Sequence, residues 1–222
     1  MCRYLSAVSH HEGGDSVSLQ QKEPLNLIIA GVGGQGNVLI SRLIGQAMVD
    51  DGYKVTIGET YGASQRGGSV SSHIRISRDH GYGAIIPEGQ ADIVLGLEPM
   101  EALRHLALCG SPETYVITNT RPIHPMCVAT GEADYPVLET MRKSINELSK
   151  RAWFINASEI ALNLGASLLA NIVMVGALVG LNVMQLRPDR FEHQLEANFQ
   201  KDKLDLNLQA FRTGLSYNFG SY

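Results

Sequence analysis

The pattern of apolar and polar positions predicts a chain of alternating strands and helices. Residues 25–31 form an apolar run that ends in glycine, which is typical of a buried strand, and residues 37–52 carry apolar side chains at helical spacing. Residues 53–59 predict a second strand, so these segments form a strand–helix–strand unit with parallel strands. The same patterns predict a strand, a turn and a helix over 91–108, a strand over 114–120, a helix over 136–152 and a strand over 153–158.

Two further segments have weaker strand patterns. Residues 69–77 alternate between apolar and polar side chains, as expected of a strand that buries one face. Ile74 and Ile76 belong to the predicted core face, whereas His73 lies on the more polar face. Residues 81–89 predict a short edge strand that ends at Pro87.

The segment 160–186 contains no charged side chain and is long enough to span a bilayer. Asparagine and glutamine residues interrupt it and Gly165 divides it into two predicted helices, so we favour a core or a subunit interface, including a homodimer contact, over a membrane span. The spacing Gly176-x-x-x-Gly180 would let another backbone approach closely, which we interpret as an interface between proteins. Residues 187–200 and 204–217 predict two more helices.

These elements together predict one α/β domain over residues 25–222. We expect a Rossmann-like, mostly parallel sheet with helices on both faces and a helical C-terminus. Residues 1–24 are polar and lack an apolar stretch, so we interpret them as a poorly ordered extension rather than a secretory signal.

Composition narrows the possible functions. The chain of 222 residues is 44% hydrophobic, enough for a substantial core, and its net charge of −4 with both signs mixed is not the pattern of a nucleic-acid-binding protein. Its three cysteines form no C-x-x-C pair, so the sequence encodes neither an iron–sulfur cluster nor a structural zinc site. A sparse, odd set of cysteines fits a reducing compartment, and we expect a cytoplasmic protein.

The sequence "GVGGQG" places Gly31, Gly33 and Gly36 between a predicted strand and a predicted helix. Glycines in this position allow a tight turn and leave backbone N–H groups at the helix N-terminus to face an anion. Glu59, near the end of the second strand, falls where a ribose-binding carboxylate would lie. The alternative is that the glycines only make a tight strand-to-helix turn. The motif is not a Walker loop, because asparagine and valine follow Gly36.

The loop "TYGASQRGG" at residues 60–68 should lie beside this turn, because the first two strands end at the same edge of a parallel sheet. Arg66 offers a planar donor fork for a phosphate or carboxylate, and Gly67 lets the backbone approach a ligand. Ser64 adds a neutral hydrogen-bonding group. The alternative is an ordinary polar surface loop.

No set of catalytic residues emerges from the sequence. His73 fits a structural role, and the pair His124 and Cys127 lacks the further ligands that a metal site needs. The sequence does not support a Ser/His/Asp set, a Cys/His set or a pair of catalytic carboxylates.

Four segments together resemble one family of proteins. They are "IIAGVGGQGNVLISRLIGQA", "GETYGASQRGGSVSSHIRIS", "ADIVLGLEPMEALRHL" and "ANIVMVGALVGL". In this order they resemble the gamma-type subunits of the 2-oxoacid:ferredoxin oxidoreductases, among them the small subunit of indolepyruvate ferredoxin oxidoreductase. The resemblance covers residues 25–218, and the first 24 residues have no counterpart in it.

The resemblance implies a function that depends on partners. In that family, thiamine diphosphate and iron–sulfur clusters on a large partner subunit perform the chemistry, and the complex reduces ferredoxin. The implied reaction is oxidative decarboxylation of an aryl pyruvate with coenzyme A, which gives an arylacetyl-CoA and carbon dioxide. No cofactor is expected on the isolated chain, which should be inactive. The resemblance also implies a contact with coenzyme A, which we assign to Gly33, Gly34, Gly36, Ser64, Arg66 and Gly67.

Two alternatives stay open at this point. The first is a self-sufficient NAD(P)-binding oxidoreductase, which would need a second, substrate-binding region although only about 160 residues follow the first strand–helix–strand unit. The second is a non-catalytic assembly subunit that contacts no ligand.

Overall fold

One six-stranded sheet organises the part of the chain that the structure describes. The computed structural model describes residues 22–62, 68–125, 128, 130–132 and 134–220, so residues 1–21 of the expected extension lie outside it. The strands are β1 (Leu25–Val32), β2 (Lys54–Tyr61), β3 (Ser69–Ser77), β4 (Ile93–Gly96), β5 (Tyr115–Asn119) and β6 (Arg151–Ile155). The helices are α1 (Asn37–Asp50), α2 (Pro99–Cys109), α4 (Leu138–Leu148), α5 (Ala157–Asn163), the short 3₁₀ helix η2 (Ser167–Leu169), α6 (Ala170–Gly180), α7 (Pro188–Asn198) and α8 (Lys201–Leu215).

The strands lie in the order β2-β3-β1-β4-β5-β6. β1, β4, β5 and β6 pair in parallel, as the sequence predicted. The predicted unit of the first two strands needs a correction, because β3 lies between β1 and β2 and pairs antiparallel with both. β2 still runs in the same direction as β1. The cause is the connection between β2 and β3, which is too short for a crossover and therefore forms a hairpin.

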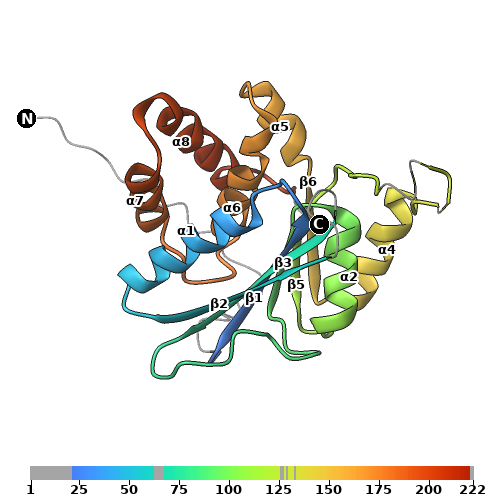
Figure 1. Ribbon diagram of the computed structural model, residues 1–222, viewed down its shortest axis with the longest axis horizontal. Coiled ribbons are helices and arrows are strands. Elements are labelled where there is room, and N and C mark those ends of the chain that lie inside the picture. Colours follow the sequence, from blue (N-terminus) through green and yellow to red (C-terminus); the bar gives the residue numbers. More distant parts are fainter. Residues whose placement is uncertain (1–21, 63–67, 126–127, 129, 133, 221–222) are drawn as a thin grey trace, which may run out of the picture.

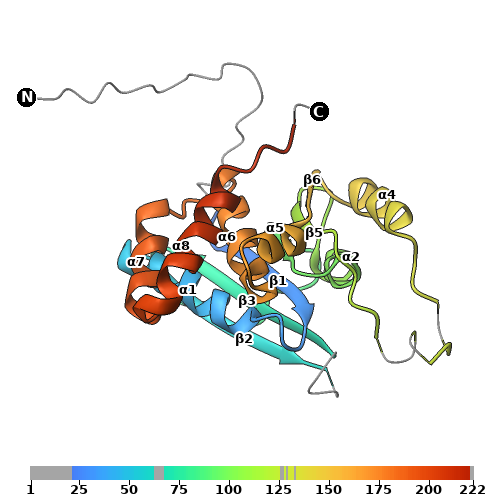
Figure 2. The ribbon, with the colours of Figure 1, turned by 90° about the horizontal axis from the view of Figure 1, so that it is seen from above.

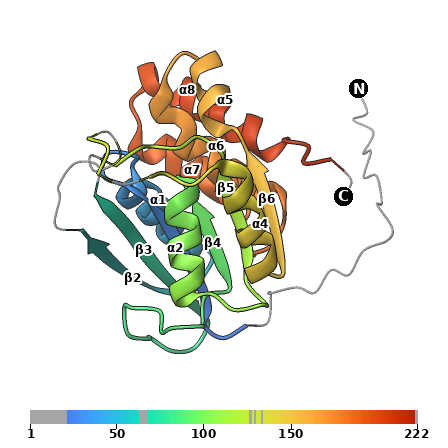
Figure 3. The ribbon, with the colours of Figure 1, turned by 90° about the vertical axis from the view of Figure 1, so that its right-hand side faces the viewer.

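Helices cover both faces of the sheet, which confirms the predicted fold class (Figure 1). One core lies between the sheet and α1, α6, α7 and α8, and includes Ile29 and Phe211. The other lies beneath α2 and α4, which Figure 3 shows in front of the sheet, and includes Ile28 and Leu106. The neighbouring residues Ile28 and Ile29 thus face opposite cores, which explains why the sequence of β1 is apolar throughout.

β3 is also buried on both faces, in contrast to the one-sided strand predicted for residues 69–77. Ile74 and Ile76 join the core beneath α1, as predicted, but His73 on the other face is only 4% exposed. The segment 81–89 does not form the predicted edge strand. It passes over this second face instead, where the backbone N–H of Ile86 donates to Nδ1 of His73 (3.3 Å).

The apolar segment 160–186 divides near Gly165, as predicted, and its small residues contact another part of the same chain. A Cβ atom on Gly176 would lie 2.1 Å from the carbonyl oxygen of Phe211, and one on Gly214 would lie 2.0 Å from that of Val173. The expected interface between proteins is therefore a contact between α6 and α8. Among the described residues, no helix is both long enough and apolar enough to cross a membrane.

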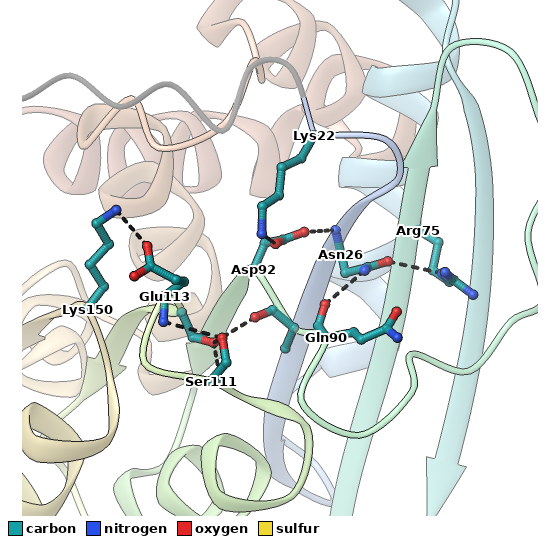
Figure 4. A network of polar contacts seen from close by, with 10 residues as sticks. Lys22, Asn26, Arg75, Gln90, Asp92, Ser111, Glu113 and Lys150 are labelled. Carbon is teal, nitrogen blue, oxygen red and sulfur yellow. Dashed lines mark hydrogen bonds and ion pairs between the residues drawn. The ribbon is translucent and has the colours of Figure 1, made fainter.

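A polar network at the amino end of the sheet holds the start of β1 (Figure 4). The buried carboxylate of Asp92 accepts hydrogen bonds from Nζ of Lys22 (2.5 Å) and from the backbone N–H of Asn26 (2.8 Å). The Asn26 side chain donates to the carbonyl oxygen of Gln90 (2.8 Å) and accepts from Nε of Arg75 (3.0 Å). Three segments that are distant in sequence are thus joined at the amino end of the sheet: residues 22–26, Arg75 in β3, and residues 90–92.

Candidate functional site

A cleft lies at the carboxyl ends of β1 and β4, where the chain continues to opposite sides of the sheet. In open α/β sheets this change of direction leaves a crevice in which ligands bind. The cleft has a volume of about 430 Å³ and is lined by residues 32–35, by the segments after β4 and β5, and by α5, η2 and α6. The described residues that line it carry amide, hydroxyl and apolar side chains but no charge.

The predicted site residues Gly33, Gly34 and Gly36 form the turn between β1 and α1 at this cleft. Gly34 and Gly36 have φ angles of 102° and 84°, which favour glycine. A Cβ atom on Gly36 would also lie 2.3 Å from Nδ2 of Asn171 at the start of α6, whereas Gly34 faces open space. Gly36 is thus required by the tight turn itself, and Gly34 leaves room for another molecule to approach the backbone.

Amide side chains fix the geometry of the turn. The side chain of Gln35 accepts a hydrogen bond from the backbone N–H of Val32 (2.8 Å) and donates to the carbonyl oxygen of Leu97 (2.9 Å). Asn119, at the end of β5, donates to the same oxygen (3.1 Å), and Asn171 donates to the backbone carbonyl of Gln35 (3.1 Å). Sequence reasoning missed Asn119 and Asn171, because a single amide within a strand or a helix carries no periodic signal.

The N-terminus of α1 presents backbone N–H groups at the same edge. The N–H groups of residues 36–39 have no acceptor among the described residues, no side chain caps the helix, and no acidic residue lies in its first turn. The buried Oδ1 of Asn37 also lacks a hydrogen-bond partner there. Free N–H groups at the positive end of a helix dipole suit an anionic group.

The described end of the loop between β2 and β3, at Gly68, lies beside the glycine turn, as predicted. The backbone N–H of Gly33 donates to the carbonyl oxygen of Gly68 (2.9 Å), which joins the two loops at the carboxyl edge. The other three predicted contact residues are in the part of this loop that lies outside the described residues: Ser64, Arg66 and Gly67. Their roles stay predictions.

The structure does not support Glu59 as a ribose-binding carboxylate. β3 separates β2 from β1, so Glu59 lies two strand spacings, about 10 Å, from the strand that leads into the glycine turn. A ribose-binding carboxylate in a dinucleotide-binding fold lies on the strand next to that turn. The carboxylate of Glu59 accepts a hydrogen bond from the hydroxyl of Tyr61 instead.

A buried carboxylate that the sequence did not reveal lies next to the cleft. Glu98, directly after Leu97, is 1% exposed and caps α2 by accepting from the backbone N–H of Glu101 (2.9 Å). It also accepts from the N–H of Ile123 (3.3 Å) and from the hydroxyl of Tyr135, and so holds the connection between β5 and α4 at the carboxyl edge. Burial raises the pKa of Glu98 more than these three donors lower it, and burial together with Glu98 raises the pKa of Tyr135.

The Glu98→Gln substitution is expected to change how the free energy of unfolding depends on pH. Because burial raises the pKa of Glu98, the folded state binds a proton more tightly than the unfolded chain between the ordinary pKa of 4.5 and the raised value. Lowering the pH through this window therefore stabilises the wild type relative to the variant, which has no proton to gain. Chemical denaturation of both proteins from about pH 7 to about pH 4.5 measures this difference, and a difference that stays constant would contradict the raised pKa.

Metal and thiol chemistry have little basis among the described residues. No group of three or more His, Cys, Asp or Glu side chains among the described residues could hold a metal ion. Cys109 is buried, and burial raises the pKa of its thiol, which disfavours the reactive thiolate. His124 packs against the ring of Tyr135, with 4.8 Å between the ring centres, while Cys127 lies outside the described residues.

Comparisons with known sequences identify relatives along most of the chain. The family model described as pyruvate ferredoxin/flavodoxin oxidoreductase matches residues 26–217. Indolepyruvate oxidoreductase subunit IorB of Archaeoglobus fulgidus is 40% identical over 190 residues, which cover 86% of this chain and 93% of that protein. The subunit of the same name from Thermococcus kodakarensis is 37% identical over 191 residues, with 86% and 94% covered.

Solved structures share the fold at lower sequence identity. The gamma subunit of a keto/oxoacid ferredoxin oxidoreductase from Geobacter sulfurreducens has a TM-score of 0.60 and 23% identity, with 86% of this chain and 95% of that chain covered. The 2-oxoglutarate:ferredoxin oxidoreductase of Magnetococcus marinus, solved with 2-oxoglutarate, coenzyme A and succinyl-CoA bound, has a TM-score of 0.67 and 21% identity, with 87% and 31% covered. From β1 to the end of α8, this chain therefore belongs to the pyruvate ferredoxin/flavodoxin oxidoreductase family.

Proposed function

We propose that this protein is the small, non-autonomous subunit of a 2-oxoacid:ferredoxin oxidoreductase that acts on indolepyruvate and related aryl pyruvates. Four relatives that are 37–40% identical over most of the chain are named indolepyruvate oxidoreductase subunits, which supports this substrate class. In the proposed reaction the bond between the keto carbon and the carboxylate breaks and carbon dioxide leaves. The acyl group joins the sulfur of coenzyme A, and the electrons released reduce ferredoxin.

This proposal places thiamine diphosphate and the iron–sulfur clusters on a large partner subunit. Thiamine diphosphate stabilises the carbanion that forms as carbon dioxide leaves, and the clusters carry electrons away. A cluster held by four thiolates does not fit this chain, which has three cysteines, one of them buried in the core. The chain alone is therefore inactive in this proposal, and ferredoxin meets the complex through the partner. The sparse, odd set of cysteines fits a reducing compartment, and we place the protein in the cytoplasm.

The observation that carries the proposal is the uncharged cleft with exposed apolar side chains around it. Tyr61 at the end of β2 is 63% exposed and Leu168 in η2 is 72% exposed, and both lie at the carboxyl edge. Leu39 and Ile123 are also exposed there. Leu168 and Ile123 line the cleft itself, and Tyr61 and Leu39 lie further along the same edge of the sheet. Exposed apolar side chains along one edge are typical of a surface that another protein covers. We infer that this edge closes against the active site of the partner subunit.

Coenzyme A is the ligand that we propose for this edge. The free N–H groups at the start of α1 and the guanidinium of Arg66 suit its phosphate groups. The uncharged, amide-bearing lining of the cleft suits the uncharged arm that connects those phosphates to the thiol. The proposed contacts are Gly33, Gly34, Gly36, Ser64, Arg66 and Gly67. The distance of Glu59 from the glycine turn makes NAD(P) a poorer candidate, since Glu59 does not lie on the strand next to that turn.

The Arg66→Ala substitution is expected to raise the KM for coenzyme A in the assembled complex by about tenfold or more, because a charge-assisted hydrogen bond to phosphate is lost. Steady-state kinetics over a range of coenzyme A concentrations measure the change. Arg187→Ala is a matched control, because Arg187 lies near Asp51 at the far end of α1 (3.8 Å) and should leave the KM unchanged.

Two results, one from these kinetics and one from the isolated chain, would count against the proposal. An unchanged KM for Arg66→Ala would favour an assembly subunit that contacts no ligand. Turnover by the isolated chain, or visible iron–sulfur absorption from it, would contradict the placement of the cofactors on a partner.

A further inference from the structure

A groove of about 1030 Å³ follows the outer edge of β6, the last strand of the sheet. Its lining comes from α4, from β6 and from the segment after α8, and Figure 2 shows β6 between those two elements. No described strand pairs with the outer edge of β6. The backbone N–H and C=O groups along this edge are therefore available to an additional strand.

Two arginines on this groove have no acceptor among the described residues. Cζ of Arg142, from α4, lies 4.8 Å from the ring centre of Phe154, and Cζ of Arg151 lies 4.9 Å from that of Trp153. Neither guanidinium forms a hydrogen bond or an ion pair within that part of the chain, and Nε of Arg142 is buried without a partner. A guanidinium group without an acceptor has unused hydrogen-bond donors, and both of these arginines line the groove, where an acidic group could approach them.

The two lysines of the groove, unlike the two arginines, form ion pairs with carboxylates of this chain. Lys143 pairs with Glu147 (3.9 Å), and Lys150 pairs with Glu113 (2.9 Å). Their charges are already balanced by carboxylates of this chain. Among the charged side chains that line the groove, Arg142, Arg151 and Glu139 form no ion pair with a described residue, so the groove keeps an excess of positive charge. Each of the two guanidinium groups is held against an aromatic ring.

The two arginines approach the edge of β6 from opposite faces of the sheet. Trp153 packs into the core beneath α8 and Phe154 against the core beneath α4, because consecutive residues of a strand point to opposite sides. Arg151 therefore lies on the same side of the sheet as Trp153, and Arg142 lies on the same side as Phe154. An extended segment paired with β6 would also alternate its side chains, so two consecutive residues of it would meet the two guanidinium groups.

We propose that the outer edge of β6 binds an extended segment of the large partner subunit that carries two consecutive acidic residues. The segment adds a seventh strand to the sheet, and its carboxylates take Arg142 and Arg151 as partners. This inference depends on the proposed function for the existence of that partner, but it concerns a different surface from the carboxyl edge. A second copy of this chain fits the groove less well, since pairing two β6 edges would bring the unbalanced arginines of both copies together.

The experiment compares two pairs of variants in binding to the purified large subunit. Arg142→Gln with Arg151→Gln is expected to raise the Kd by at least about tenfold, and to reduce its dependence on salt. Lys201→Gln with Lys203→Gln removes the same charge from the exposed start of α8 and should leave the Kd unchanged. Far-UV circular dichroism checks that each variant is folded, because Arg151 lies against the ring of Trp153 and its removal would change the tryptophan fluorescence by itself. In the wild-type complex, hydrogen exchange of the β6 amides should slow by at least about tenfold compared with the free chain.

These measurements test the strand addition at β6 separately from the proposed role as a subunit. A complex in which β6 exchanges as fast as in the free chain would overturn the strand addition and leave the subunit assignment intact. Slower exchange of β6 at high concentration of the free chain would overturn it in favour of a second copy. Failure of the wild-type chain to bind the large subunit would overturn both proposals together.

Discussion

The Gly214→Ala substitution is expected to lower the free energy of unfolding by about 3 kcal/mol, and Gly176→Ala by a similar amount. The added Cβ atoms would lie 2.0 Å and 2.1 Å from backbone carbonyl oxygens of the facing helix, and those atoms move only if α6 and α8 separate. Separation would loosen a core that includes Met174 and Phe211, both fully buried. Denaturant titration followed by circular dichroism measures the loss.

The direction of the change in stability tests whether the two helices are in close contact. Alanine is a better helix former than glycine by about 1 kcal/mol, so a helix without the close contact would be stabilised by the same change. Gly81→Ala is the control, because a Cβ atom there would meet no atom within 4 Å, and its effect should stay within about 0.5 kcal/mol. Stabilisation by Gly214→Ala would show that the two helices are further apart than described.

The Asp92→Ala substitution is expected to destabilise the fold by about 3 kcal/mol. Asp92 is 3% exposed, and its carboxylate accepts hydrogen bonds from Nζ of Lys22 and from the backbone N–H of Asn26. Its loss leaves a buried N–H group without an acceptor where the chain enters β1. The free energy of unfolding from urea titration is the measurement.

An exposed aspartate provides the matched comparison for Asp92. Asp189 also pairs with a cation, Arg187 at 2.5 Å, but its side chain is 61% exposed. Asp189→Ala should therefore cost less than about 1 kcal/mol. Equal costs for the two substitutions would mean that burial adds nothing at Asp92, and that the network at the amino end of the sheet does not hold β1.

Local periodicity was sufficient to predict most elements of the sheet and its covering helices. The apolar run of β1 and the helical spacing of α1 each reflect which side chains are buried. The positions of apolar residues along the sequence therefore predict these elements. The position of β3 was not predictable in this way. A strand pattern says that a segment pairs but not with which neighbour, and here the short hairpin placed β3 between β2 and β1.

Some residues of the candidate site could be predicted from local sequence, and others could not. The glycine turn was predictable, because the left-handed conformations at Gly34 and Gly36 need that residue type. Asn119, Asn171 and Glu98 were not, because their roles depend on contacts between segments that are distant in sequence. The small-residue spacing at Gly176 correctly indicated a close backbone contact, but only the fold shows that the contacting backbone is α8.

The contact between α6 and α8 has a consequence for the order of events during synthesis. α6 is buried along nearly its whole length, and its first turn supplies Asn171 to the glycine turn. α8 is the last of the described helices to leave the ribosome, so until then α6 lacks the surface that covers it and the cleft lacks a fixed wall. A partner that binds the cleft would therefore bind only a chain that has been translated through α8. Assembly would then depend on complete synthesis of this helix.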